Sequence, residues 1–224
     1  KEKVQAILPV HAFEETKFVV MLTEKGIIKK TSLDAFSNPR PSGIIALTTD
    51  LDDRMISAKI SNGQCDLFIA TKDGMSIRFD EGDVREMGRS ARGVKGITLG
   101  KDDIVIGMEI IEKGSKSTIL MVTENGYGKR TEVEEYRTQS RGGVGIITQK
   151  TTDKVGQVVG TCSVLDTDEV MITTDKGQII RMNCSDISVV GRNTQGVRLI
   201  NLNQDEKVTG IAIITDDGGD AILN

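Results

Sequence analysis

The chain has 224 residues and a formal net charge of -4, with 38% hydrophobic and 28% charged residues. That length fits one large all-β domain or two ordinary domains, and the composition is too apolar for a disordered chain. We find no apolar run near the ~20 residues of a membrane-spanning helix and no secretory signal pattern, so we expect no membrane contact and a cytoplasmic protein.

Residues that commonly carry metal or nucleophilic chemistry are scarce. Cys65, Cys162 and Cys184 are an odd number, lie far apart and form no C-x-x-C pair, so we expect reduced structural thiols. The single histidine, His11, follows "VQAILPV" in a polar break and is expected at the surface. One histidine cannot build a multi-histidine metal site, and we expect no metal or cofactor in this chain.

In chain order, the first recurring element is a hairpin: "FVVMLTEKGIIKKT", "LFIATKDGMSIRF", "ILMVTENGYGKRT" and "VMITTDKGQIIRM". Each segment has an apolar strand, a two-residue turn and a second strand. Glycine adopts positive φ without steric cost, which suits tight hairpin turns. The turn dipeptides lie 48, 52 and 51 residues apart, by subtraction: Lys25-Gly26, Asp73-Gly74, Asn125-Gly126 and Lys176-Gly177.

A second glycine follows each hairpin, within "NPRPSGIIAL", "GRSARGVKGI", "SRGGVGIITQ" and "GRNTQGVRLI". About nine residues later comes an acidic turn, such as Asp102-Asp103, and then another apolar stretch. The pattern predicts roughly four strands per repeat and no helix. The aligned glycines are Gly43, Gly93, Gly145 and Gly196.

A period near fifty residues with four strands per unit predicts an all-β, propeller-like β-pinwheel in a single domain, 1–224. An open solenoid of hairpins is the alternative. The opening "EKVQAILPV" resembles the later "EKVTGIAII", so we expect residues 1–17 to end an upstream blade and the chain to be part of a longer polypeptide. The approximate repeats are 18–66, 67–117, 118–168 and 169–224.

Positive charge recurs in phase with the repeat. A cation lies four residues after each turn glycine, and further cations surround the second glycine. Unselected surface charge has no reason to recur at this period, so we interpret these residues as a basic belt. They are Lys29, Lys30, Arg40, Arg78, Arg89, Arg92, Lys95, Lys129, Arg130, Arg137, Arg141, Arg181, Arg192 and Arg198.

A basic belt with little other chemistry suits a polyanion. Aromatic residues are only 3%, which disfavours base stacking with single strands and favours duplex DNA held by its phosphates. Nucleotide binding is disfavoured because "GYGKRT" lacks P-loop spacing. We find no catalytic constellation. A protein-binding propeller that docks an acidic partner remains an alternative.

Four segments together, "ENGYGKRTEVEEY", "VGRNTQGV", "GVKGI" and "AILPVHAFEE", closely resemble the C-terminal domain of bacterial DNA gyrase A, over essentially the whole chain. The resemblance implies a six-bladed β-pinwheel with exchanged strands that binds duplex DNA and bends it into a positively handed wrap. It also implies partnership with the rest of gyrase A and with gyrase B in a type IIA topoisomerase, whose ATP and Mg²⁺ are used elsewhere to drive negative supercoiling. The equivalent domain of topoisomerase IV is the nearer alternative.

The family's signature box reads Q-R-R-G-G-x-G and belongs to its first blade. Here "QSRGGVG" has Ser140 at the second position and lies in the third full repeat. We therefore interpret this segment as that repeat's own loop and expect the true box upstream. The residues that match the box are Gln139, Arg141, Gly142, Gly143 and Gly145.

Overall fold

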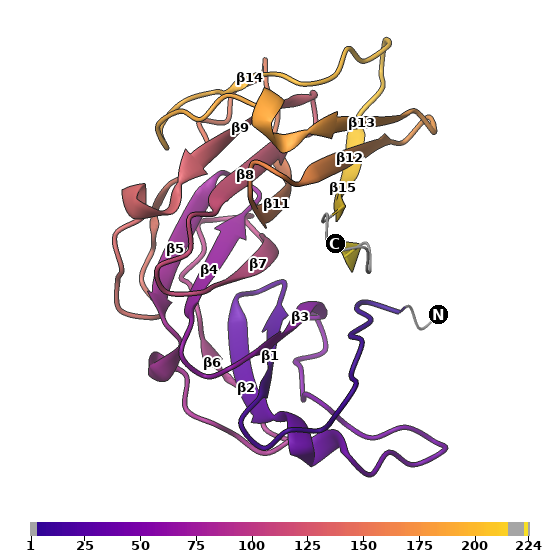
Figure 1. Cartoon of the computed structure of the whole chain (residues 1–224), viewed down its shortest axis with the longest axis vertical. Helices are drawn as coiled ribbons and strands as arrows, with labels where there is room; N and C mark the ends of the chain where they lie inside the picture. The colour runs from indigo at the N-terminus through magenta and orange to yellow at the C-terminus, as the bar shows by residue number, and fades with distance from the viewer. Residues whose placement is uncertain (1–3, 215–221, 224) are drawn as a thin grey trace.

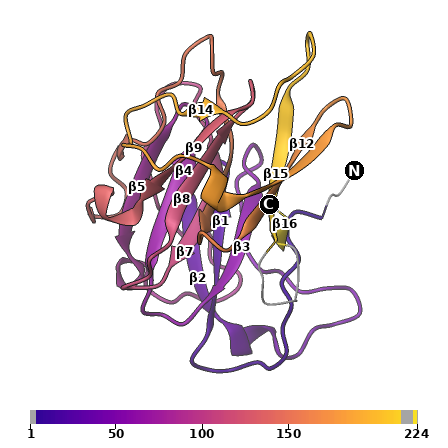
Figure 2. The ribbon, with the colours of Figure 1, turned by 45° about the horizontal axis from the view of Figure 1, so that its top comes forward.

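A computed structural model describes residues 4–214 and 222–223. Four antiparallel sheets of four strands follow one another along an arc (Figure 1), which confirms the all-β, propeller-like prediction. None of the described helices is long and apolar enough to cross a membrane. The sheets stack face against face with their long strands in similar directions (Figure 2).

Each sheet is built on one hairpin and one inner strand. The hairpins are β1 (Phe18–Thr23) with β2 (Ile27–Ser32), β4 (Asp66–Thr71) with β5 (Met75–Asp80), β8 (Thr118–Thr123) with β9 (Tyr127–Glu132), and β12 (Glu169–Thr174) with β13 (Ile179–Asn183). The inner strands are β3 (Met55–Ser61), β7 (Val105–Ile111), β11 (Val158–Val164) and β15 (Val208–Ile214).

The outermost strand of the first three sheets comes from the following repeat. β6 (Val94–Lys95) pairs with β2, β10 (Ile146–Ile147) with β5, and β14 (Val197–Arg198) with β9. Each of these three blades is therefore completed by a strand from the next repeat. In the fourth sheet β13 is an edge among the described residues, and β16 (Ile222–Leu223) pairs with β15 on the opposite side.

Four short 3-10 helices, which the sequence did not predict, follow the hairpins: η1 (Leu33–Phe36), η2 (Glu81–Asp83), η3 (Val133–Glu135) and η4 (Cys184–Asp186). Each spans three or four residues, too short to leave a helical period in the sequence. After η2, η3 and η4 the chain runs to the strand that pairs with the preceding blade.

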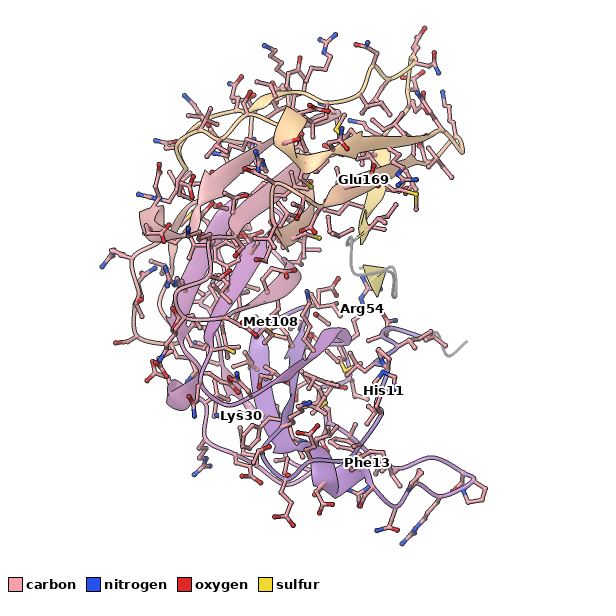
Figure 3. The ribbon with its side chains drawn as sticks, viewed as in Figure 1. His11, Phe13, Lys30, Arg54, Met108 and Glu169 are labelled. Atoms are coloured by element: carbon pink, nitrogen blue, oxygen red, sulfur yellow. The ribbon has the colours of Figure 1, made fainter. Side chains whose placement is uncertain are left out.

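The hydrophobic core lies between blades, which explains the apolar runs of the first hairpin strands. On β4, Leu67 and Ile69 pack toward the first blade, while Phe68 and Ala70 pack toward the third. Successive side chains of a strand point to opposite faces, so a strand with a blade on each side must be apolar throughout. Met108 on the inner strand β7 joins the cluster between the first two blades (Figure 3).

Candidate nucleic-acid interface

Three of the four turn glycines, Gly26, Gly74 and Gly126, lie at joints, which are the contacts between neighbouring blades and are numbered one to three along the chain. Gly74 has φ of 83°, and its carbonyl accepts N–H bonds from Thr148 (2.8 Å) and Gln149 (3.2 Å) of the next repeat. A Cβ on Gly74 would lie 2.2 Å from the Gln149 carbonyl oxygen. The equivalent bonds run from the N–H of Gly96 to Gly26 and from the N–H of Leu199 to Gly126.

The second glycine of the second, third and fourth repeats docks on the hairpin of the blade before it. Gly145 has φ of 77°, and a Cβ there would lie 2.2 Å from the carbonyl oxygen of Ser76 on β5. These glycines recur because two backbones meet where no side chain fits. Gly93 and Gly196 make the same approach to the carbonyl oxygens of Ile28 and Gly128, with Cβ distances of 2.6 and 2.4 Å.

Gly177 and Gly43 occupy the same two positions at the ends of the series. They keep positive φ, 83° and 79°, but a Cβ on either would meet nothing within 4 Å. Among the described residues no neighbouring repeat covers them. The positive φ is therefore a property of each repeat, whereas the close backbone approach occurs only where a neighbouring repeat packs against the glycine.

Three of the four cations that follow the turn glycine lie inside the joints, which corrects their expected place on a basic surface. Lys30 donates to the Glu81 carbonyl oxygen (3.1 Å) and is largely buried in the first blade (Figure 3). Arg78 donates to the carbonyl oxygens of Val133 (2.9 Å) and Tyr136 (3.2 Å).

Arg130 repeats this contact at the third joint, where its Nε donates to the Ile187 carbonyl oxygen (3.0 Å) and its guanidinium pairs with Asp166. In each joint the cation therefore binds the 3-10 helix segment of the next repeat. The fourth cation, Arg181, lies on the edge strand β13, where its exposed side chain pairs with Glu169.

Lys29 and Lys129 are also buried, which corrects their expected exposure. The Lys129 ammonium donates to the carbonyl oxygens of Gly191 (2.8 Å) and Arg192, and Lys29 donates to the carbonyl oxygens of Ala46 (2.6 Å) and Arg89. Burial lowers the pKa of each lysine to about 8, because desolvation disfavours the charged form. These lysines hold the incoming loop.

Two half-buried loop arginines tie successive loops together. Arg141 donates from Nε to the Asp83 carbonyl oxygen (3.1 Å) and from Nη1 to the Lys95 carbonyl oxygen. Arg192 donates from Nη1 to the Ile147 carbonyl oxygen (2.8 Å). Arg89, at the equivalent position, is also half-buried. Backbone carbonyls thus use part of the hydrogen-bonding capacity of these arginines.

The box-like loop lies in the second joint. Gln139 donates its N–H to the Arg78 carbonyl oxygen (2.8 Å), and Gly142 donates its N–H to the Gly96 carbonyl oxygen (2.8 Å). The Gly143 carbonyl oxygen accepts from the N–H of Thr98 (2.8 Å). The loop therefore runs against the outer loop of the preceding repeat, and its glycines serve this backbone contact.

The remaining predicted cations are exposed, and all except Arg40 lie in the segments that carry the outermost strands. Arg92 pairs with Asp50, and the ion pairs between described residues include none of the others. The sequence analysis missed three exposed cations nearby, which do not recur in all four repeats: Arg85, Lys150 and Lys154. The exposed predicted residues are Arg40, Arg92, Lys95, Arg137 and Arg198. We call Arg85, Lys95, Arg137, Lys150 and Arg198 the rim cations.

The recurrent acidic turns stabilise the hairpins. The Asp53 carboxylate accepts from the backbone N–H of Lys25 (3.0 Å), and the Asp103 carboxylate accepts from that of Asp73 (2.9 Å). Each carboxylate thus caps the hairpin turn of its own blade. Within residues 4–214 and 222–223, no three His, Cys, Asp or Glu side chains form a group that could hold a metal ion.

These features define a class of protein: a strand-exchanged, propeller-like array whose outermost segments carry exposed cations. A family model described as "DNA gyrase C-terminal domain, beta-propeller" matches residues 17–62, 66–112, 117–161 and 168–215. The chain belongs to this family, and the resemblance seen in the sequence is confirmed.

Among relatives, the A subunit of DNA gyrase from Salmonella typhimurium is 45% identical over 223 residues, which cover 100% of this chain and 25% of that protein. The chain thus spans about a quarter of that relative's length. Two solved structures share the fold. The C-terminal domain of DNA topoisomerase IV has a TM-score of 0.86 at 23% identity and covers 93% of this chain and 65% of its own. The DNA gyrase A C-terminal domain has a TM-score of 0.81 at 24% identity and covers 90% and 67%.

Proposed function

We propose that this chain binds duplex DNA by its phosphates and bends it along the outer edge of the blades. The observation that carries the proposal is that the rim cations are exposed on the outer segments of successive blades. DNA that contacts several of these segments must follow the arc of the sheets, so binding and bending are one event. Membership in the gyrase C-terminal domain family supports this function.

The energetics are compatible with such a surface. Smooth bending of a 20–30 bp duplex by 40–90° costs roughly 1–6 kcal/mol. If all the rim cations contact phosphates, log affinity should fall against log salt with a slope of about -4 to -5. Several weak contacts, distributed over the blades, can offset the bending cost where a single contact cannot.

Within a longer protein, the proposed role is to support ATP-dependent negative supercoiling by a DNA gyrase. The partners would be the remainder of gyrase A and the gyrase B protein, in the cytoplasm, with ATP and Mg²⁺ used outside this chain. This chain contributes positioning of DNA. The box-like loop, with Gln139 and Gly143, contributes to the joint rather than to chemistry.

The experiment measures binding of a random-sequence duplex of about 30 bp by fluorescence anisotropy over a series of salt concentrations. A rim variant, Lys95→Ala with Arg137→Ala, is compared with Lys101→Ala with Lys116→Ala, which removes two exposed lysines outside the rim. The rim variant should bind more weakly and flatten the salt slope by about 2. Equal effects of the two variants would contradict a localised interface, and absence of salt-sensitive binding would favour a protein partner.

A further inference from the structure

The third joint places two cations over one aromatic ring. The ring is that of Tyr127, the first residue of β9, and it is largely buried. The Lys154 ammonium and the Arg198 guanidinium carbon each lie 5.4 Å from the ring centroid. The two charges are therefore no more than twice that distance apart, although they come from different repeats.

Hydrogen bonds fix the arginine in this arrangement. Arg198 donates from Nη2 to the Tyr127 hydroxyl (2.9 Å) and from Nη1 to the Asn201 side-chain oxygen (3.4 Å). A guanidinium has five N–H donors, so three remain for a ligand. The hydrogen bond from Arg198, with the positive charges of Arg198 and Lys154, lowers the pKa of the Tyr127 phenol.

Among the described residues, neither cation has a carboxylate within ion-pair distance. The ion pairs found between described residues include neither Lys154 nor Arg198, and both side chains are exposed. Two like charges that share one ring repel each other, and a bound anion offsets that repulsion. The cation–aromatic contacts hold the charges in place while leaving them accessible.

This arrangement does not recur in the other joints. The position of Tyr127 is Ile27 in the first repeat and Met75 in the second, and the position of Arg198 is Ile147 in the second joint. Recurrence of the fold therefore does not explain the aromatic residue. The third joint therefore differs from the first two because it places two cations beside the hydroxyl group of Tyr127.

We propose that Tyr127, Lys154 and Arg198 form a phosphate-binding site that anchors the DNA backbone at the third joint. The proposal rests on the proposed function, because it takes the phosphate to be part of a duplex. Arg198 supplies directional N–H donors to the phosphate oxygens, and Lys154 supplies a second charge. Tyr127 positions both cations and places its hydroxyl beside the anion.

The matched control is Lys101, an exposed lysine at the equivalent place in the second repeat. Lys101 lies three residues before Ile104, and Lys154 lies three residues before Gln157. The carbonyls of Ile104 and Gln157 accept equivalent N–H bonds, from Lys72 and Glu124. Lys101 has no aromatic residue at the corresponding hairpin position.

The first arm of the test measures duplex affinity for Lys154→Ala, Arg198→Ala, the double variant and Lys101→Ala. Arg198→Ala should weaken binding about tenfold, and the double variant should lose less than the product of the single losses, because both cations hold one phosphate. Lys101→Ala should change affinity little. Equal losses for Lys154→Ala and Lys101→Ala, with independent effects in the double variant, would overturn the proposal.

The second arm needs no DNA. The chain has two tyrosines, and burial raises the pKa of Tyr136, so the first phenolate absorbance to appear as the pH rises reports Tyr127. Saturating tripolyphosphate should raise the pKa of Tyr127, because the anion offsets the two cations, and Arg198→Ala should reduce that shift. An unchanged Tyr127 titration in the wild type would reject the site. Wild-type DNA binding without this shift would refute only the site, whereas the shift without DNA binding would refute only the proposed function.

Discussion

Replacing Gly74 with alanine should destabilise the protein much more than replacing Gly177. Both glycines have φ of 83°, so the backbone strain of an alanine is the same at the two positions. That strain is about 1–2 kcal/mol. They differ in their surroundings, because a Cβ at Gly74 would lie 2.2 Å from the Gln149 carbonyl oxygen and one at Gly177 would meet nothing within 4 Å.

The extra cost at Gly74 follows from the contacts that must move. The next repeat donates two N–H bonds to the Gly74 carbonyl, from Thr148 (2.8 Å) and Gln149 (3.2 Å). A net loss of about 0.5–1.5 kcal/mol for each bond adds about 1–3 kcal/mol. We therefore expect a total loss of about 2–5 kcal/mol for Gly74→Ala and about 1–2 kcal/mol for Gly177→Ala.

Urea unfolding followed by far-ultraviolet circular dichroism would measure both free energies of unfolding. The slope against urea concentration must be checked, because arrays of repeats can unfold in parts. Equal losses for the two variants would refute the role of Gly74 as a joint residue. A larger loss for Gly177→Ala would show that the fourth hairpin has contacts that the described residues do not account for.

Three further results are expected. Arg130→Ala should lower the free energy of unfolding by roughly 2–4 kcal/mol, because the Ile187 carbonyl loses its charged donor. Arg137→Ala should leave stability nearly unchanged and weaken DNA binding. Urea denaturation measures the first effect, and fluorescence anisotropy measures the second. Because the pKa of Lys129 is about 8 in the folded protein and 10.5 in the unfolded chain, the unfolded state binds more protons between these pH values. Stability should therefore rise with pH across that window, by at most about 3 kcal/mol from this lysine, and Lys129→Met should remove that part of the rise in pH-dependent urea titrations. Cys184, buried with its pKa raised to about 11 by desolvation, should not react with a thiol reagent near neutral pH until the protein is unfolded, and rapid native labelling would contradict its burial.

The sequence predicted the hairpins and the recurring glycines because both depend on local backbone chemistry. The turn at Gly126 needs positive φ whatever packs against it, so its period survives in the sequence. The apolar runs of the first hairpin strands likewise show that both faces of these strands are covered. The joint itself remained hidden, because its outer strands, such as Val94–Lys95, are two residues long and pair with another repeat.

The cations that recur with the repeat show that periodicity in the sequence does not by itself place a side chain on the surface. Arg130 and its acceptor Ile187 are 57 residues apart, so the sequence does not reveal that the guanidinium is used inside a joint. A recurring joint and a basic belt produce the same period. Lys154 and Arg198 were harder to assess, because their shared contact with Tyr127 exists only after segments of two repeats have come together.

The most direct test of DNA bending is ligation of nicked circular DNA in the presence of increasing amounts of this chain, followed by removal of the protein and measurement of the linking number. We predict a shift that grows with bound protein and has the positive sign that the family resemblance implies. The rim variant Lys95→Ala with Arg137→Ala should reduce the shift at equal protein concentration. Saturated binding of the wild type with no change in linking number would contradict the claim that the arc of blades wraps DNA.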